Sequence, residues 1–206
     1  MGDLYDFFAI GKNRFCFAIG DVSGKGVPAS LFMAVTRTLL RSLAEKQTSP
    51  AVIANNLNKS LSLNNESCMF VTFFMGIIDL NDGTIRYINA GHNPPVLIRK
   101  EGTVQLFENA GTIPLGLNAD FSYPEQKMVI NKDDKIFFYT DGVNEAENAS
   151  AELLGDKRML EVIEMHKAQP PRDLIHSMEA AIEAHVAGFP QSDDITMMVM
   201  AFKGGQ

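Results

Sequence analysis

The chain has 206 residues, of which 46% are hydrophobic and 21% charged, and this composition predicts one soluble globular domain with a sizeable core. The formal net charge is −7 and no cluster of Lys and Arg occurs, which argues against nucleic acid as the main partner, because binding to phosphate backbones depends on clustered positive charge. No apolar run approaches the roughly 20 residues that cross a bilayer, and the first residues lack the basic and apolar regions of a signal peptide. We therefore expect no membrane contact by this segment.

The two cysteines, Cys16 and Cys68, each lie among apolar residues. Two such residues fit buried thiols in a reducing compartment better than they fit a disulfide framework. The expected location is therefore the cytoplasm, which leaves open a membrane anchor elsewhere in the parent protein.

The first part of the chain predicts a strand followed by two helices. An apolar run over residues 14–22 indicates a buried strand, which ends in a Gly-rich turn at 24–26. Pro28 suits the first turn of a helix, and the apolar residues after it recur at helical spacing and predict one packed face. That face consists of Leu31, Phe32, Val35, Leu39, Leu40 and Leu43. A second helix is expected from Ser49, a cap residue followed by Pro, toward Leu61.

Strands dominate the middle of the chain, and helices return near its end. Two hairpin signals, Asn81-Asp82-Gly83 and Lys100-Glu101-Gly102, separate short apolar runs. The expected strands cover residues 69–80, 85–90, 96–99, 104–107, 128–130, 135–140 and 195–202. Helices are expected over 158–166 and from Pro170 onward. Hairpin-linked strands with separate helix pairs indicate an α+β layered domain rather than a parallel doubly wound sheet.

Several aspartates lie where a predicted apolar strand meets a turn. Asp21 and Asp141 follow such strands, and Asp193 and Asp194 precede the last one. Carboxylates at strand ends can converge at one edge of a sheet, and several of them together are electrostatically tolerable only with cations between them. A hard divalent ion with oxygen ligands suits such a group, because the sequence has no cluster of Cys and His with zinc spacing. For any single Asp, a turn or cap role is the simpler interpretation.

Five motifs occur in an order that resembles bacterial SpoIIE/RsbU-type phosphatases of the PPM, or type-2C-like, superfamily. They are Gly2-Asp3-Leu4-Tyr5-Asp6-Phe7-Phe8, Gly20-Asp21-Val22-Ser23-Gly24-Lys25-Gly26, Ala90-Gly91-His92-Asn93-Pro94-Pro95, Tyr139-Thr140-Asp141-Gly142-Val143 and Ser192-Asp193-Asp194-Ile195-Thr196. The resemblance covers almost the whole chain. It implies that residues 1–206 form a single phosphatase catalytic domain without its N-terminal strand and without a sensory or receiver domain. The implied fold is a four-layer sandwich of two mostly antiparallel sheets flanked by helices.

The resemblance also implies a site with two ions, Mn²⁺ or Mg²⁺. Asp21 resembles the carboxylate that bridges both ions, with the backbone carbonyl of Val22 as a further ligand. Asp141 and Asp193 are similar to the ligands that complete the first metal site, and the three aspartates would act in catalysis through a metal-activated water. The remaining candidates, for binding metal-bound waters or an additional ion, are Asp3, Asp6 and Asp194.

Two positions bear on the general acid. Eukaryotic members carry His where this chain has Ser23, so protonation of the leaving oxygen must come from elsewhere. His92 is a candidate by its chemistry, but a histidine in a Gly-His-Asn-Pro turn more often orders that turn.

The resemblance further implies a phosphoserine or phosphothreonine substrate on a STAS-domain protein of the anti-anti-sigma type, in a bacterial partner-switching pathway, and it leaves a homodimer open. The alternative is a catalytically inactive phosphatase-fold module that binds a regulatory partner. Retention of Asp21, Asp141 and Asp193 argues against that alternative. A Walker phosphate loop is excluded by the spacing of Gly20 to Gly26, and a haloacid-dehalogenase-like phosphatase by Tyr139, which occupies the place of the aspartyl nucleophile.

Overall fold

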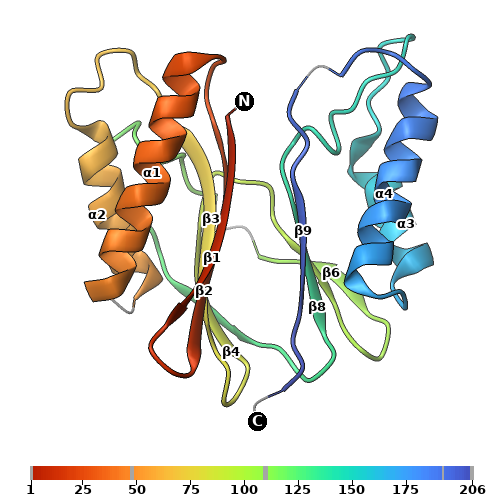
Figure 1. Ribbon diagram of the computed structural model, residues 1–206, viewed down its shortest axis with the longest axis horizontal. Helices are drawn as coiled ribbons and strands as arrows, with labels where there is room; N and C mark the ends of the chain where they lie inside the picture. Colours follow the sequence, from red (N-terminus) through yellow and green to blue (C-terminus); the bar gives the residue numbers. More distant parts are fainter. Residues whose placement is uncertain (1, 47–48, 109–110, 192, 205–206) are drawn as a thin grey trace. The chain divides into compact units, whose positions relative to one another are not determined.

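The computed structural model describes residues 2–46, 49–108, 111–191 and 193–204. Ser192, at the start of the last sequence motif, lies outside these ranges. The chain divides into two compact units: unit 1 consists of Met1–Pro94, Glu108–Ile130 and Gly204–Gln206, and unit 2 of Pro95–Phe107 and Asn131–Lys203. Within the described residues, each unit contains one antiparallel sheet and one pair of helices (Figure 1).

The sheet of unit 1 has the strand order β1-β2-β3-β4-β7. Its strands are β1 (Asp3–Ile10), β2 (Arg14–Val22), β3 (Val71–Asp79), β4 (Thr84–Ala90) and β7 (Gln126–Val129). The hairpin predicted at Asn81-Asp82-Gly83 joins β3 to β4, and Gly83 takes a positive φ of 71° there. The sequence did not predict β1, because its alternation sets charged residues among aromatic ones.

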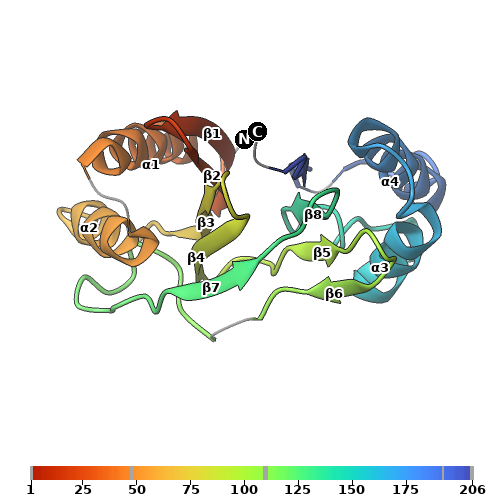
Figure 2. The same cartoon turned by 90° about the horizontal axis from the view of Figure 1, so that it is seen from below.

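Two helices cover one face of this sheet (Figures 1 and 2). Helix α1 (Val27–Lys46) packs on β1 and β2, and helix α2 (Pro50–Ser62) packs on β3 and β4. The predicted cap of α2 is confirmed, since the Ser49 hydroxyl accepts a hydrogen bond from the Val52 amide at 3.4 Å. The core between the helices and the sheet includes Leu40, Ile53 and Phe73, all fully buried.

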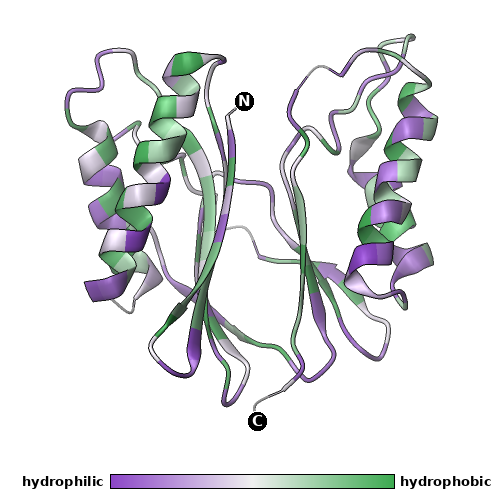
Figure 3. Cartoon of the chain, in the orientation of Figure 1, coloured by the Kyte–Doolittle hydropathy of each residue, from purple (hydrophilic) through white to green (hydrophobic). Residues whose placement is uncertain are grey.

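The predicted packed face of α1 is partly wrong. Leu31 and Val35 are 63% and 50% exposed. The buried stripe is instead Ala29, Thr36, Leu40 and Ala44. Small residues in this stripe let the helix approach the sheet closely, and the larger side chains of Phe32, Met33, Leu39 and Leu43 pack along its borders. Figure 3 shows the resulting mixture of hydrophobic and hydrophilic residues around α1.

The sheet of unit 2 has the strand order β6-β5-β8-β9. Its elements are β5 (Val96–Ile98), β6 (Val104–Leu106), β8 (Lys135–Tyr139), α3 (Gly155–His166), α4 (Pro171–Val186) and β9 (Met197–Ala201). The hairpin predicted at Lys100-Glu101-Gly102 joins β5 to β6. Helix α4 packs on β9 and on α3, and Phe137, Ile163 and Met178 lie in the core they share.

The α+β class with two antiparallel sheets and four helices is therefore confirmed for the described residues. The two cysteines differ from each other. Cys16 is fully buried as expected, and burial raises the pKa of its thiol to about 12, to which the negative charge of Asp6 contributes. Cys68 is exposed, so the expectation of a second buried thiol is wrong. Across the ranges described, no helix has the length and apolar character needed to span a membrane.

Candidate metal centre

In unit 1, Asp21 and Asp3 lie on the same face of the sheet. The register pairs Asp3 on β1 directly with Asp21 near the end of β2. Because side chains directly opposite each other in an antiparallel pair project from the same face, the two carboxylates are neighbours across the strands. That face is the one not covered by α1 and α2, since the alternation places Cys16 and Ala18 of β2 in the core with those helices. Unit 1 therefore brings together two of the predicted acidic residues.

The space beside Asp21 and Val22 depends on Gly2. The Val22 amide donates to the Gly2 carbonyl at 3.2 Å, which holds the chain before β1 against the end of β2. A Cβ placed on Gly2 would lie 2.7 Å from the Val22 carbonyl oxygen and 3.0 Å from Oδ1 of Asp21. The missing side chain thus lets the chain at Gly2 lie close to two hard oxygen atoms, a carbonyl and a carboxylate. Oxygen donors of this kind are the ligands that Mg²⁺ and Mn²⁺ prefer.

The expectation for Asp6 is corrected by its position in β1. Asp6 pairs with Ala18, three residues along β1 from Asp3, and so projects from the opposite face, toward α1. Its carboxylate is 3% exposed and accepts hydrogen bonds from Arg41 at 2.6 Å to each oxygen. Arg37 contributes a further ion pair at 3.3 Å. Asp6 therefore fixes α1 to the sheet and does not join Asp21.

The chain reverses direction in a tight turn after Val22, and two glycines allow the backbone conformation that this turn needs. Gly24 and Gly26 have positive φ values of 84° and 76°. The Ser23 hydroxyl accepts a hydrogen bond from the Phe70 amide at 2.9 Å, and the Ser23 amide donates to the Phe70 carbonyl at 2.9 Å. Ser23 thus ties this turn to the segment before β3. Lys25 is exposed in the same turn.

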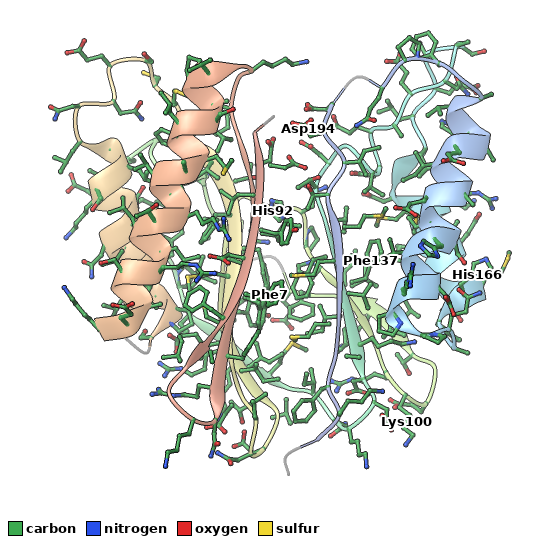
Figure 4. All side chains as sticks on the ribbon, in the orientation of Figure 1. Phe7, His92, Lys100, Phe137, His166 and Asp194 are labelled. Carbon is green, nitrogen blue, oxygen red and sulfur yellow. The ribbon has the colours of Figure 1, made fainter. Side chains whose placement is uncertain are left out.

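In unit 2, the predicted acidic residues flank the paired ends of β8 and β9. The Thr140 amide donates to the Thr196 carbonyl, and the Thr196 amide donates to the Thr140 hydroxyl, both at 3.0 Å. These bonds place Asp141 two residues after the end of β8. Asp194 lies in the segment that enters β9 (Figure 4). Gly142 is required here, because a Cβ at this position would overlap the carbonyl oxygen of Asp194.

Within unit 2, the negative charges of Asp141 and Asp193 act on a third acidic residue, Glu145. Burial raises the pKa of Asp141, and the negative charge of Asp193 raises it further. Burial also raises the pKa of Glu145, with contributions from Asp141 and then Asp193. In the part of the chain that the structure describes, no Lys or Arg forms an ion pair with any of these three residues. A divalent cation bound near these acids would relieve this repulsion.

Sequence reasoning missed Glu145 because it does not lie at a strand end. The available signal was its spacing of four residues from Asp141: the Glu145 amide donates to the Asp141 carbonyl at 2.8 Å, which closes a single helical turn. Over the described ranges, no group of three His, Cys, Asp or Glu residues meets the requirements of a metal site. The candidate ligands are therefore two sets: Asp3, Asp21 and the Val22 carbonyl in unit 1, and Asp141, Asp193 and Asp194, now with Glu145, in unit 2.

Comparison with solved structures defines the class of the fold. The RsbU and RsbW domains of Rv1364c from Mycobacterium tuberculosis match with a TM-score of 0.83 at 26% identity, over 100% of this chain and 57% of that one. The PP2C phosphatase domain of SpoIIE from Bacillus subtilis, solved with a fragment of its regulatory domain, matches with a TM-score of 0.82 at 23% identity, over 96% and 57% of the two chains. The chain thus has the α+β fold of PPM, or PP2C-type, phosphatase domains.

The sequence comparison is more specific. The family model for Stage II sporulation protein E (SpoIIE) matches residues 11–203, and the chain belongs to this family. The phosphoserine phosphatase RsbU of Bacillus subtilis is 29% identical over 203 residues, which cover 98% of this chain and 59% of RsbU. The chain spans between 35% and 59% of the length of three curated relatives that it matches.

Proposed function

We propose that the chain hydrolyses phosphoserine or phosphothreonine on a protein substrate and that it depends on two divalent cations, Mn²⁺ or Mg²⁺. The observation that carries this proposal is the set of oxygen donors at the motif positions of a SpoIIE-family fold: Asp21 with the Val22 carbonyl close to Gly2, and Asp141, whose pKa is raised by burial and by the negative charge of Asp193. The family resemblance and the name of the relative RsbU, a phosphoserine phosphatase, support the same reaction.

The proposed roles follow the positions of the ligands. Asp21 would bridge the two ions, the Val22 carbonyl and Asp3 would bind beside it, and Asp141 with Asp193 would complete the first metal site. Asp194 and Glu145 would orient bound water. When bound, such a pair of ions supplies charge stabilisation to the phosphoryl oxygens and a water of lowered pKa. Asp21 and Val22 lie at the end of β2, and Asp141 follows β8 by two residues. Hydrogen bonds at these strand ends would hold the oxygen donors in place, which limits reorganisation during the reaction.

For the substrate, we infer a phosphorylated STAS-domain protein of the anti-anti-sigma type in a bacterial partner-switching pathway. Support comes from the family resemblance and from the membership of the SpoIIE family. Such a substrate accords with a cytoplasmic location for the chain. A homodimer of the chain is also compatible with this substrate. Phosphorylated STAS proteins incubated with the chain and Mn²⁺ should lose one phosphate, about 80 Da by mass spectrometry; an unchanged panel would contradict this choice of substrate.

The reaction itself is tested by Mn²⁺-dependent hydrolysis of p-nitrophenyl phosphate. We expect turnover with Mn²⁺, none with excess chelator, and a loss of at least about 100-fold in Asp21→Asn and Asp141→Asn, because each removes a charged oxygen ligand. Asp120→Asn, an exposed carboxylate in unit 1, is the matched control and should retain wild-type turnover. Turnover that persists in chelator or in Asp21→Asn would contradict the proposal. A folded chain without turnover would favour the inactive module that binds a regulatory partner.

A further inference from the structure

His92 lies in a tight turn after β4, against the sheet of unit 1 (Figure 4). It is 4% exposed. The side chain of Asn89 spans this turn, since its Oδ1 accepts from the His92 amide and its Nδ2 donates to the His92 carbonyl, each at 2.8 Å. Gly91 has a positive φ of 68°, and a Cβ there would lie 2.8 Å from Pro114. The backbone of His92 is thus already fixed by Asn89 and needs no help from its own ring.

The imidazole ring makes a contact that the turn does not require. Its Nδ1 lies 2.9 Å from the hydroxyl oxygen of Thr72 on β3. Thr72 is the direct cross-strand partner of Asp21. The Thr72 hydroxyl oxygen accepts a hydrogen bond from the Asp21 amide at 3.3 Å and lies 3.5 Å from the Asp21 carbonyl oxygen. A continuous path therefore leads from the buried ring to the main chain of the proposed bridging ligand.

The hydrogen bond between the Asp21 amide and the Thr72 hydroxyl group has a fixed direction. The Asp21 amide can only donate, so the hydroxyl oxygen accepts from it. The hydroxyl proton then has two acceptors within reach, Nδ1 of His92 at 2.9 Å and the Asp21 carbonyl at 3.5 Å. The hydroxyl oxygen also has a second lone pair, so Nδ1 can either accept this proton or donate a proton of its own, and in both tautomers the hydroxyl oxygen is held between Nδ1 and the Asp21 amide. In this arrangement the lone pair of the Thr72 hydroxyl is aimed at the Asp21 amide.

We propose that His92 is a positioning residue: through the Thr72 hydroxyl it fixes the main chain of Asp21 at the metal-binding end of β2. The inference rests on the proposed function, because it concerns the affinity of Asp21 and Val22 for the metal. Partners of this kind, which orient ligands without touching the ion, typically change metal affinity by 10-fold to 100-fold when they are removed.

Thr72→Val tests the inference, because it keeps the branched shape of the side chain and removes only the hydroxyl group. We expect Mn²⁺ binding, measured by titration calorimetry on the whole chain, to weaken by about 10-fold. Thr72→Ser, which keeps the hydroxyl group, should retain the wild-type affinity for Mn²⁺. Thr38→Val is the matched control: its hydroxyl bonds to the Ala34 carbonyl on the exposed side of α1, and its loss should leave Mn²⁺ affinity unchanged.

A spectroscopic readout separates positioning from a merely structural role. In ¹⁵N spectra of the imidazole groups, His92 is identified by the resonance missing in His92→Gln. We expect the Nδ1 resonance to move in Thr72→Val, which removes its hydrogen-bond partner, and to stay in place in Thr38→Val.

The outcomes distinguish this inference from the proposed function. A wild-type chain that binds Mn²⁺, together with a folded Thr72→Val that binds it equally well, would overturn the positioning role and leave the phosphatase proposal intact. A His92 Nδ1 resonance that stays in place in Thr72→Val would also overturn it. A wild-type chain that neither binds Mn²⁺ nor hydrolyses phosphate esters would overturn both.

Discussion

At the scale of single residues, the two aspartates of the first motif have different tasks because they lie three positions apart in one strand. Odd spacing sends their side chains to opposite faces of the sheet. Asp3 lies opposite Asp21, whereas Asp6 enters the interface with α1 and meets Arg37 and Arg41. Burial alone would raise the pKa of Asp6, but hydrogen bonds and the positive charges of the two arginines outweigh it and lower that pKa below its ordinary value.

Asp6→Asn should reduce the free energy of unfolding by about 1–3 kcal/mol near neutral pH, because it removes the buried negative charge that accepts hydrogen bonds from the arginines. The loss is limited because the arginine side chains are partly exposed and stay hydrated. The pKa of Asp6 is lower in the folded chain, so its contribution is fully present above pH 4–5 or so and is lost as the pH falls through the folded value. Urea unfolding at several pH values measures this. Glu45→Gln on the exposed side of α1 is the control, and an equal effect of both substitutions at neutral pH would contradict the account.

The sequence predicted part of the candidate centre at this scale. Asp21, Asp141 and Asp193 were found from their places at strand ends and from the family motifs, and their joint role as ligands stays a prediction. The sequence motif groups Asp6 with Asp3, because the strand character of β1 is not evident from its residues and only the strand's alternation separates the two faces. Glu145 was missed because acidic residues in turns are common and only the fold shows that this one is affected by the charges of Asp141 and Asp193.

At the scale of elements, helix α2 holds the irregular segment that precedes β7. Asn58 is fully buried in α2. Its Oδ1 accepts from the Gly116 amide at 2.8 Å, and its Nδ2 donates to the Asn118 carbonyl at 2.8 Å. The Leu115 amide and carbonyl also bond to Val71 at the start of β3. One amide side chain thus satisfies the backbone of a segment that has no secondary structure of its own.

Asn58→Asp should destabilise the chain by about 2–3 kcal/mol, because the donor that met the Asn118 carbonyl becomes an acceptor and a charge enters a buried position. Asn56→Asp, the same change at a half-buried position of α2, is the matched control and should have a much smaller effect. Urea denaturation of both variants provides the comparison. Similar midpoints for the two would show that the bonds from Asn58 do not determine how this segment is held.

At the element scale, the hydrophobic periodicity of helix α1 predicts the helix but not which of its residues are buried. Its existence and its start near Pro28 were predicted, but its apolar residues outnumber those that one face can bury. Three apolar side chains at a spacing of four, Val27, Leu31 and Val35, are all at least half exposed. The buried stripe is chosen by close packing of Ala29 and Ala44 against β1 and β2, which a hydrophobic pattern does not encode.

At the scale of the whole molecule, the class of the fold was predictable because hairpin signals and helix caps are local. The turns at Asn81-Asp82-Gly83 and Lys100-Glu101-Gly102 determined which strands pair, and Ser49 determined where α2 begins. The strand order of the two sheets was not read from local signals, because β7 and β9 join their sheets after long connections. That order is instead expected from membership of the SpoIIE family, whose model matches residues 11–203.

The central claim is that carboxylates distant in the sequence bind one pair of divalent cations. Crystals grown with Mn²⁺ and measured at a wavelength where manganese scatters anomalously test it directly. The account predicts two anomalous peaks about 3.5–4 Å apart, with Asp21 bound to both and Asp141 and Asp193 bound to one of them. Peaks that contact Asp21 but neither Asp141 nor Asp193, or an Asp21 carboxylate without manganese in a crystal that holds it elsewhere, would contradict the claim.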